Sequence, residues 1–284
     1  MKQLKLILLS ATAGFMLNAC SGEAPVSQES SVTTADAGGD KKVLAIGSDM
    51  TFPPYEYLDE QGKPQGVDVE IMAKMAELNG DFTPEWEDTR WANLIPGLKG
   101  GKFDVLYSSM YITKDRLEQI DMIPYYKTDI SLLVRGDSDL APRGANDLCG
   151  HNIGAMKGTE FANQLREISK KCESENKGAI TIKEYETSPQ TTQALMSKAV
   201  DIQYDDAAVM TAAESKLGDR VKITSTEEFY PIVGGIGVRK GDTETYDIIN
   251  GAIEKMKASG DLAKILGTYG LTVPSQADID NVMN

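Results

Sequence analysis

Histidine and cysteine are scarce in this 284-residue sequence, which contains one histidine, His151, and three cysteines. Zinc and other transition metals are held mostly by clusters of these residue types, so we expect neither a metal nor another cofactor. His151 stands beside Cys149, and the sequence shows no nucleophile–base arrangement around it. We therefore interpret His151 as a structural residue and not as a catalytic one.

Basic residues are outnumbered by acidic ones. The sequence has 29 Lys and Arg against 43 Asp and Glu, a formal net charge of −14. An acidic balance of this size argues against nucleic acid or an anionic membrane surface as a partner. It favours attraction of cations, an effect that physiological salt weakens.

An apolar run at the N-terminus is too short to span a membrane. Residues 6–17 are apolar and follow a basic start, which is typical of a secretory signal. The run ends in Leu17-Asn18-Ala19-Cys20, which resembles the lipobox of bacterial lipoproteins, with Asn18 in place of the usual small residue. We expect 1–19 to be a lipoprotein signal peptide and Cys20 to be lipidated; the alternative is plain secretion after Ala19.

The cysteine count agrees with this interpretation. If Cys20 carries lipid, Cys149 and Cys172 remain as a pair, and outside the cytoplasm such a pair is expected to be oxidised. Closing the loop between them would contribute about 3 kcal/mol on the chain-entropy account. The alternative is two unpaired buried thiols.

The rest of the chain divides into a tether and a folded part. Residues 20–40 contain small and polar residues with two valines, so we expect a flexible tether. From residue 43 onward, strand and helix patterns alternate, which predicts an α/β fold of two lobes with a cleft between them. Strands are expected at 43–47, 103–107, 130–134, 152–156, 180–185, 201–204 and 235–238, and helices at 66–78, 92–98, 160–171, 189–199, 207–217, 243–259 and 261–269.

Residues 108–116 are predicted to form a hydroxyl-rich turn between a strand and a helix. Thr113 is a good N-cap for a helix that continues through Leu117 and Ile120. Arg116 then lies in the first turn, where a cation opposes the helix dipole. Hydroxyls, free N–H groups and a guanidinium together are suited to hold a carboxylate. An ordinary surface ion pair is the alternative role for Arg116.

Nine motifs, in order along about residues 42–270, resemble the periplasmic solute-binding proteins (family 3) of polar amino-acid ABC transporters. They lie at 47–57, 66–70, 91–104, 112–116, 121–126, 157–159, 201–206, 237–240 and 260–269. The resemblance implies a type II periplasmic-binding-protein fold, a two-lobed clamp with the ligand in the interlobe cleft and two hinge crossings. Lobe 1 would comprise 41–127 plus 233–284 and lobe 2 residues 128–232, with crossings at or beside 130–134 and 231–235.

The same resemblance implies a site for the two charges of an α-amino acid. Arg116 would hold the ligand carboxylate, helped by Ser109, Tyr111, Gly158 and Thr159. Asp206 would hold the ligand ammonium; its alternative role is N-cap of the following helix. Tyr111 departs from the usual small residue at its position.

The side-chain pocket is expected to contain two aromatic residues and several acids. Phe52 and Trp91 would sandwich the ligand's stem, and core packing is their alternative role. Because the acids outnumber Arg116, we expect a cationic ligand such as arginine, lysine, ornithine or histidine. For Glu160 a favourable position in the helix dipole is the alternative. The full expected pocket is Asp49, Phe52, Trp91, Met110, Glu160 and Asp205.

We therefore expect a monomeric substrate-binding lipoprotein of an amino-acid ABC importer, which delivers its ligand to a membrane permease and is not an enzyme. Its place would be the cell envelope, on the periplasmic face in a Gram-negative host or the outer face of the membrane in a Gram-positive one. Two rival functions are a same-fold dehydratase of prephenate-like or arogenate-like acids and a ligand-presenting module of a sensor.

Overall fold

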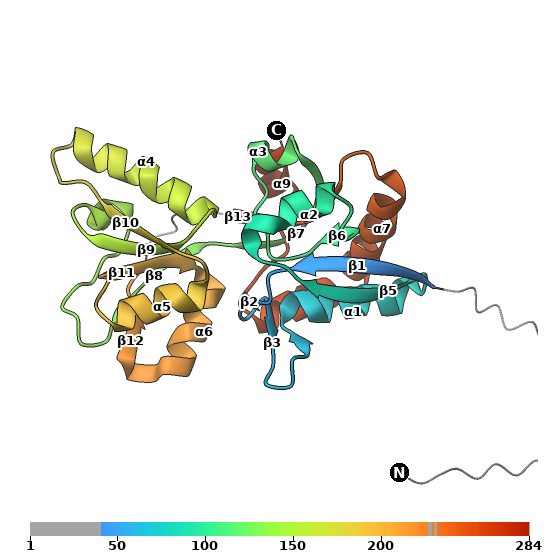
Figure 1. Ribbon diagram of the computed structural model, residues 1–284, viewed down its shortest axis with the longest axis horizontal. Coiled ribbons are helices and arrows are strands. Elements are labelled where there is room, and N and C mark those ends of the chain that lie inside the picture. Colours follow the sequence, from blue (N-terminus) through green and yellow to red (C-terminus); the bar gives the residue numbers. More distant parts are fainter. Residues whose placement is uncertain (1–40, 227–228, 230–231, 284) are drawn as a thin grey trace, which may run out of the picture. The chain divides into compact units, whose positions relative to one another are not determined.

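Two five-stranded sheets form the framework of the computed structural model (Figure 1), which describes residues 41–226, 229 and 232–283. The expected signal peptide, the tether and Cys20 lie outside the described residues. The first sheet has the order β5 (Phe82–Asp88), β1 (Lys42–Ser48), β6 (Val105–Leu106), β13 (Ile232–Arg239), β7 (Ile120–Thr128). β1 is parallel to β5 and β6, whereas β13 runs antiparallel to β6 and β7.

The second sheet lies between helices on its two faces. Its order is β10 (Thr181–Tyr185), β9 (Asn152–Met156), β11 (Ile202–Asp206), β8 (Ile130–Arg135), β12 (Val221–Ile223). Figure 1 shows α4 (Glu160–Ser174) on one face and α5 (Ser188–Met196) and α6 (Ala207–Leu217) on the other. β9 is parallel to both of its neighbours, and β8 is antiparallel to β11 and β12.

The chain passes between the two sheets at two places. Asp129 alone separates β7 from β8. The return connection follows β12 and leads into β13, and part of it, including Pro231 of the expected crossing, lies outside the described residues. The first sheet is thus built from the segments before the first connection and after the second, and the second sheet from the continuous segment between them.

Most of the remaining elements surround the first sheet, whereas η2 (Ala145–Leu148) and η3 (Gly218–Arg220) pack against α4 and α6 beside the second. α1 (Val67–Asn79) packs against β5 and α7 (Thr243–Ser259), and α2 (Leu94–Lys99) packs against β1, β6 and β13. The other short elements are β2 (Thr51–Phe52), β3 (Glu56–Leu58), β4 (Pro64–Gln65), η1 (Trp91–Asn93), α3 (Lys114–Leu117), α8 (Asp261–Thr268) and α9 (Gln276–Met283).

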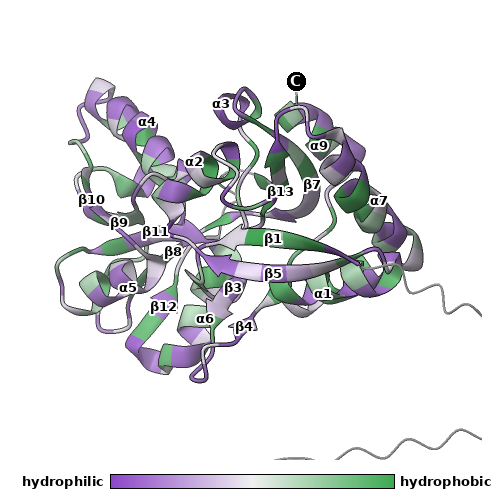
Figure 2. Cartoon of the chain, turned by 45° about the vertical axis from the view of Figure 1, so that its right-hand side comes forward, coloured by the Kyte–Doolittle hydropathy of each residue, from purple (hydrophilic) through white to green (hydrophobic). Residues whose placement is uncertain are grey.

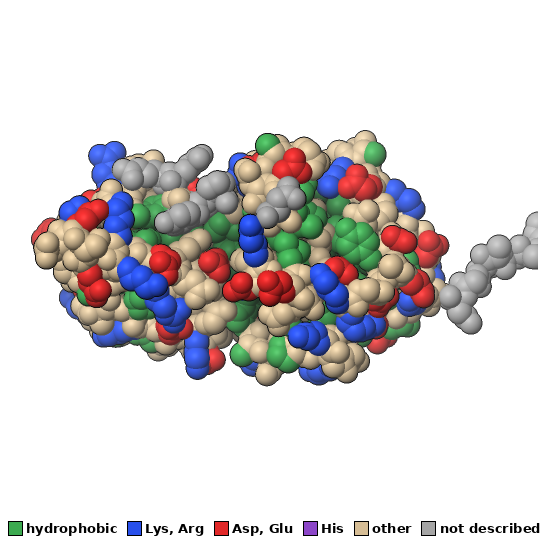
Figure 3. All heavy atoms as spheres, turned by 90° about the horizontal axis from the view of Figure 1, so that it is seen from above, with side chains coloured by type: hydrophobic (Ala, Val, Ile, Leu, Met, Phe, Trp, Pro, Cys, Tyr) green, Lys and Arg blue, Asp and Glu red, His purple; other side chains and the backbone are tan. Residues whose placement is uncertain are grey.

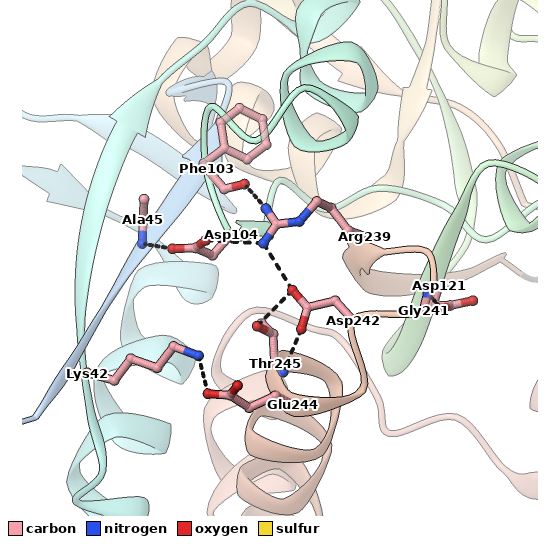
Figure 4. A network of polar contacts seen from close by, with 10 residues as sticks. All are labelled: Lys42, Ala45, Phe103, Asp104, Asp121, Arg239, Gly241, Asp242, Glu244 and Thr245. Carbon is pink, nitrogen blue, oxygen red and sulfur yellow. Dashed lines mark hydrogen bonds and ion pairs between the residues drawn. The ribbon is translucent and has the colours of Figure 1, made fainter.

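Apolar strands and helix faces form the core. Much of β1 is coloured as hydrophobic in Figure 2, and its Leu44 and Ile46 are fully buried. In the same sheet, Arg239 at the end of β13 donates to Phe103 O and pairs with Asp104 and Asp242 (Figure 4). These bonds fasten the end of β13 to the start of α7 and to the turn before β6.

Gly66 shows why one motif needs glycine. It precedes α1 with φ at 116°, a backbone conformation that other residues avoid. A Cβ at this position would lie 2.2 Å from Tyr55 O, so a side chain is also excluded by space. The α1 start is therefore held against the loop that carries Tyr55 and Glu56.

Most predicted elements appear within a few residues of their expected bounds, but two need correction. Thr113 does cap α3, accepting a hydrogen bond from Arg116 N at 3.3 Å. However, α3 ends at Leu117, and Ile120 begins β7, because pairing with β13 along the whole strand outweighs local helix propensity. The strand expected at 103–107 is reduced to β6, two residues long.

The structure contains the expected disulfide. Cys149 and Cys172 lie with their sulfur atoms 2.02 Å apart and join the segment after η2 to the last turn of α4. The alternative of two unpaired thiols is excluded in this structure.

Candidate functional site

A cavity lies where several strands end. β1, β6 and β9 each run toward it, and the segments that follow their carboxyl ends line it, which is where α/β sheets commonly bind ligands. The elements around the first sheet contribute Asp49, Phe52, Glu56, Trp91, Ser109, Tyr111 and Arg116, and the β9–α4 segment contributes Met156, Thr159, Glu160 and Phe161. Side chains attached to both sheets thus face one cavity.

Arg116 places a half-buried cation on the cavity wall. Its Nη1 donates to Tyr111 O at 2.6 Å, and its guanidinium carbon lies 5.3 Å from the ring centroid of Trp91. Burial lowers the pKa of Arg116, and the nearby Glu160 carboxylate acts in the opposite direction. In the described part of the chain the guanidinium forms no salt bridge, so its remaining N–H groups are available to an anion. No ion pair of Arg116, the alternative role considered above, is present among the described residues.

Asp206 is fully buried and already has several donors. Tyr55 Oη donates to both of its oxygens, at 3.0 and 3.1 Å, and Tyr111 Oη donates to Oδ2 at 2.8 Å. Ala208 N donates to Oδ1, so Asp206 is the N-cap of α6, the alternative considered above. Burial raises its pKa to about 6. Among the described residues that line the cavity, Asp206 is absent, because Tyr111 stands between.

The aromatic pair and Asp49 are held in place by the protein itself. Trp91 Nε1 donates to Gly158 O at 2.9 Å, a contact between η1 and the turn before α4. Phe52 stacks on Tyr55 with ring centroids 5.6 Å apart. Asp49 accepts from Trp91 N at 2.8 Å and pairs with Arg90 at 2.9 Å, so its carboxylate orients η1. Burial raises the pKa of Asp49.

The second wall begins at the turn before α4. Thr159 Oγ1 donates to Met156 O at 2.5 Å and does not cap α4, so the first backbone N–H groups of this helix have no side-chain acceptor from the N-cap residue. Glu160 is half-buried and accepts from Asn163 at 3.2 Å. Its carboxylate therefore stays on the wall facing Arg116.

Two expected pocket residues are placed elsewhere. Asp205 points into the second sheet's polar cluster, where Ser188 Oγ donates to it at 2.6 Å and Gln203 Nε2 at 3.1 Å. Met110 borders a neighbouring groove and packs with Leu94 and Ile112. Neither is among the described residues that line the cavity, so the structure gives them no contact with a ligand there.

Sequence reasoning missed three wall residues, Glu56, Met156 and Phe161. Glu56 lies in the Phe52–Tyr57 motif that was recognised, but that motif assigns the residue no role. Phe161 meets Tyr111 edge-on with ring centroids 5.5 Å apart. An apolar residue directly after a Gly-Thr-Glu turn is the signal that could have placed Phe161 on the wall.

A catalytic histidine, a metal site or a membrane-spanning helix would indicate another class of protein. His151 is half-buried and lies outside the cavity. A search of the described residues finds no group of three metal-ligating side chains and no helix long and apolar enough to cross a membrane. On the face shown in Figure 3, basic side chains are interspersed with acidic ones.

This fold and site define a two-lobed amino-acid-binding protein, and comparisons with known proteins agree. The family model for "Bacterial extracellular solute-binding proteins, family 3" matches residues 44–272, so the chain belongs to that family. A relative, the "Probable histidine-binding protein" of Neisseria gonorrhoeae, is 29% identical over 265 residues, covering 91% of this chain and 92% of the relative.

Solved structures show the same architecture. An ancestral arginine-binding protein bound to arginine superposes with a TM-score of 0.72 at 28% identity, covering 81% of this chain and 98% of that one. The ancestral amino-acid-binding protein AncCDT-1, described as a precursor of cyclohexadienyl dehydratase, gives 0.70 at 26% identity over 80% and 95% of the two chains. The two-lobed α/β fold is therefore confirmed.

Proposed function

We propose that this protein captures a polar L-amino acid with a cationic side chain and delivers it to a membrane permease of an ABC importer. The observation that carries the proposal is Arg116, a half-buried residue whose guanidinium lines the cavity and has no salt-bridge partner among the described residues. A ligand carboxylate would supply that partner through charge-assisted hydrogen bonds.

The charge of the cavity supports a cationic side chain. Three carboxyl groups, Asp49, Glu56 and Glu160, line it against one cation, Arg116. The aromatic faces of Phe52 and Trp91 can bury an aliphatic stem and also attract a cation. Named relatives include histidine-binding and arginine-binding proteins, which supports this ligand class.

Capture by closure follows from the placement of these groups. Arg116 belongs to the elements around the first sheet, and Glu160 begins α4 beside the second. A ligand that contacts both stabilises the closed arrangement relative to an open one, and only that difference in affinity can drive closure. In this proposal the ligand ammonium displaces the Tyr111 hydroxyl from Asp206.

The proposal also includes a lipid anchor at the cell envelope and a membrane permease as partner. Lipidation at Cys20 would hold a monomer at the cell envelope, within reach of the permease, on the periplasmic or outer face of the membrane. Radiolabelled palmitate incorporation, lost in Cys20→Ser, would test the anchor. Retention of the label in that variant would contradict it.

A calorimetric panel of the common L-amino acids tests the ligand class. We expect micromolar or tighter binding, about −8 kcal/mol, for one or more of arginine, lysine, ornithine and histidine. Tight binding of glutamate or glutamine with no response to the cationic amino acids would contradict the class.

The likeness to AncCDT-1 makes a dehydratase the second candidate. Turnover of prephenate or arogenate by the purified protein would favour this enzyme over a binding protein. Binding of amino acids without turnover favours transport or presentation to a sensor.

A further inference from the structure

Two carboxyl groups lie together at the cavity wall, where Glu56 lines the cavity and Asp68 does not. Glu56 on β3 and Asp68 in the first turn of α1 are 1% and 0% exposed. Ser109 contacts both, because its Oγ donates to Glu56 Oε1 at 3.2 Å and its backbone N donates to Asp68 Oδ2 at 2.9 Å. One residue with φ at 44°, in the left-handed region, thus bridges two acids.

The hydrogen bonds of this pair are complete except at one atom. Asp68 Oδ1 accepts from Tyr125 Oη at 2.6 Å, and Glu56 Oε1 also accepts from Ser108 Oγ at 2.8 Å. Glu56 Oε2 is buried and accepts no hydrogen bond from a donor group in the described part of the chain. The two carboxyl groups are hydrogen-bonded to each other, which requires one of them to hold a proton.

Among the described residues, the groups around the pair supply no positive charge to it. Asp49 faces it from the loop after β1, Tyr107 from the segment after β6, and Tyr125 and Tyr126 from β7. Burial raises the pKa of all three tyrosines, so they stay neutral. Arg116 on α3 lines the same cavity but bonds neither carboxyl.

Two adjacent buried carboxyls without a cation do not both ionise near neutral pH. Burial raises the pKa of Asp68 to about 7 and that of Glu56 well above its usual range, and the charge of Asp68 raises the latter further. A proton held by the pair would satisfy Glu56 Oε2.

We propose that the Glu56–Asp68 pair receives the cationic end of the ligand's side chain, an ammonium or guanidinium, and releases its proton to solvent as that cation binds. The proposal rests on the proposed function, since Arg116 must first hold the ligand carboxylate. The balance is simple: one positive group enters, one proton leaves, and the pair changes from one negative charge to two. A neutral side chain of the same shape would bind without releasing the proton.

Proton release is measurable by calorimetry in two buffers of different ionisation enthalpy, such as phosphate and Tris. The probes are arginine with its neutral isostere citrulline, and lysine with its Nε-acetylated form. At about pH 8, above the pKa of Asp68, the pair holds one proton, and we expect the cationic amino acid to release close to one proton and its neutral counterpart none. No proton exchange for a bound cationic amino acid anywhere between about pH 5.5 and 8 would overturn the proposal.

Three variants separate the contributions of Glu56 and Asp68 to proton release and to the preference for a cationic ligand. Glu56→Gln keeps the shape of the side chain, and we expect it to abolish proton release and to bring the arginine and citrulline affinities within about threefold of each other. Asp68→Asn should reduce proton release while keeping a preference for the cation. Asp201→Asn, which alters a partly buried acid bonded to Asn152 in the second sheet, is the control and should change neither.

The outcomes distinguish this inference from the proposed function. If the wild-type protein binds no amino acid, the proposed function fails. If Arg116-dependent binding persists but Glu56→Gln keeps the cation preference and the proton release, only this inference fails. Should Glu56→Gln not fold by circular dichroism, Glu56→Asp, which shortens the side chain but keeps its charge, should lower cation affinity at least tenfold and leave the citrulline affinity within threefold.

Discussion

The Tyr111 hydroxyl lies 2.8 Å from Asp206 Oδ2 and donates a hydrogen bond to it. Tyr111 precedes α3, whereas Asp206 ends β11, so this bond connects elements of the two sheets. In the proposed site Asp206 accepts the ligand ammonium, which places a phenol where an ammonium hydrogen would bind. A ligand that uses Asp206 must therefore displace Tyr111.

Removing that hydroxyl should favour the ligand. We expect Tyr111→Phe to raise amino-acid affinity by up to about tenfold, because one hydrogen bond worth about 0.5–1.5 kcal/mol no longer competes with the ammonium. Titration calorimetry measures this change. Tyr204→Phe, which removes a hydroxyl bonded to Gln164, is the matched control and should leave affinity unchanged. A fall in affinity of tenfold in Tyr111→Phe would mean that the hydroxyl contacts the ligand instead.

Tryptophan fluorescence should report closure from a single position. The sequence has two tryptophans, Trp86 on β5 and Trp91 on the cavity wall. We expect ligand to change the emission of Trp86→Phe, where Trp91 remains, and to leave Trp91→Phe unchanged. Trp91→Phe should also bind several-fold more weakly, since the hydrogen bond to Gly158 O is lost. A ligand signal confined to Trp86 would contradict the placement of the site.

Buried acids should make the protein more stable in mild acid. Burial raises the pKa of Asp68 and Asp205 to about 7 and that of Asp206 to about 6, from 3.8 in the unfolded chain. Between about pH 4 and 7 the folded state then binds more protons than the unfolded state, so the free energy of unfolding decreases as pH rises. We expect the melting temperature to rise as pH falls from 8 to about 5.

A variant checks the origin of this slope. Asp205→Asn removes one of the raised groups and should flatten the dependence of melting temperature on pH in that range. Asp278→Asn is the control, because the pKa of Asp278 is lowered to about 2 and its effect belongs below pH 4. A wild-type melting temperature that climbs from pH 5 to 8 would contradict the assignment of these three acids.

The disulfide should support stability and not binding. Cys149 and Cys172 are 23 residues apart, and opening their loop should cost about 3 kcal/mol. Cys172 lies near the end of α4, about 18 Å along the helix from Glu160. We expect the double variant Cys149→Ser, Cys172→Ser to lose this stability in urea denaturation while keeping ligand affinity. Loss of affinity in a folded double variant would contradict the separation of the two regions.

The elements that sequence predicted well are those with local signals. The bounds of α6 and α7 match their predicted ranges because each begins beside a capping aspartate and ends at a glycine. β7 and β5 were missed because their pairing partners lie far away in sequence, and a strand that depends on such pairing carries a weak local pattern.

The residues of the site also divide into those predicted from local motifs and those whose placement depends on distant parts of the chain. Arg116, Trp91 and Thr159 reach the cavity because their motifs fix the local backbone. The hydrogen bonds of Asp206 could not be predicted, because their donors, Tyr55 and Tyr111, are distant in sequence and contact Asp206 only in the folded chain. The displacement of Asp205 from the cavity likewise follows from strand register, because adjacent residues of β11 point to opposite faces.

Calorimetry of Arg116→Gln tests the central claim most directly. The guanidinium is proposed to hold the ligand carboxylate, and losing charge-assisted bonds worth about 1.5–3 kcal/mol should weaken every amino acid by about 10- to 150-fold. Arg166→Gln, which changes a cation paired with Glu184 outside the cavity lining, should keep affinity within a few-fold. Wild-type affinity in a folded Arg116→Gln protein would contradict the account.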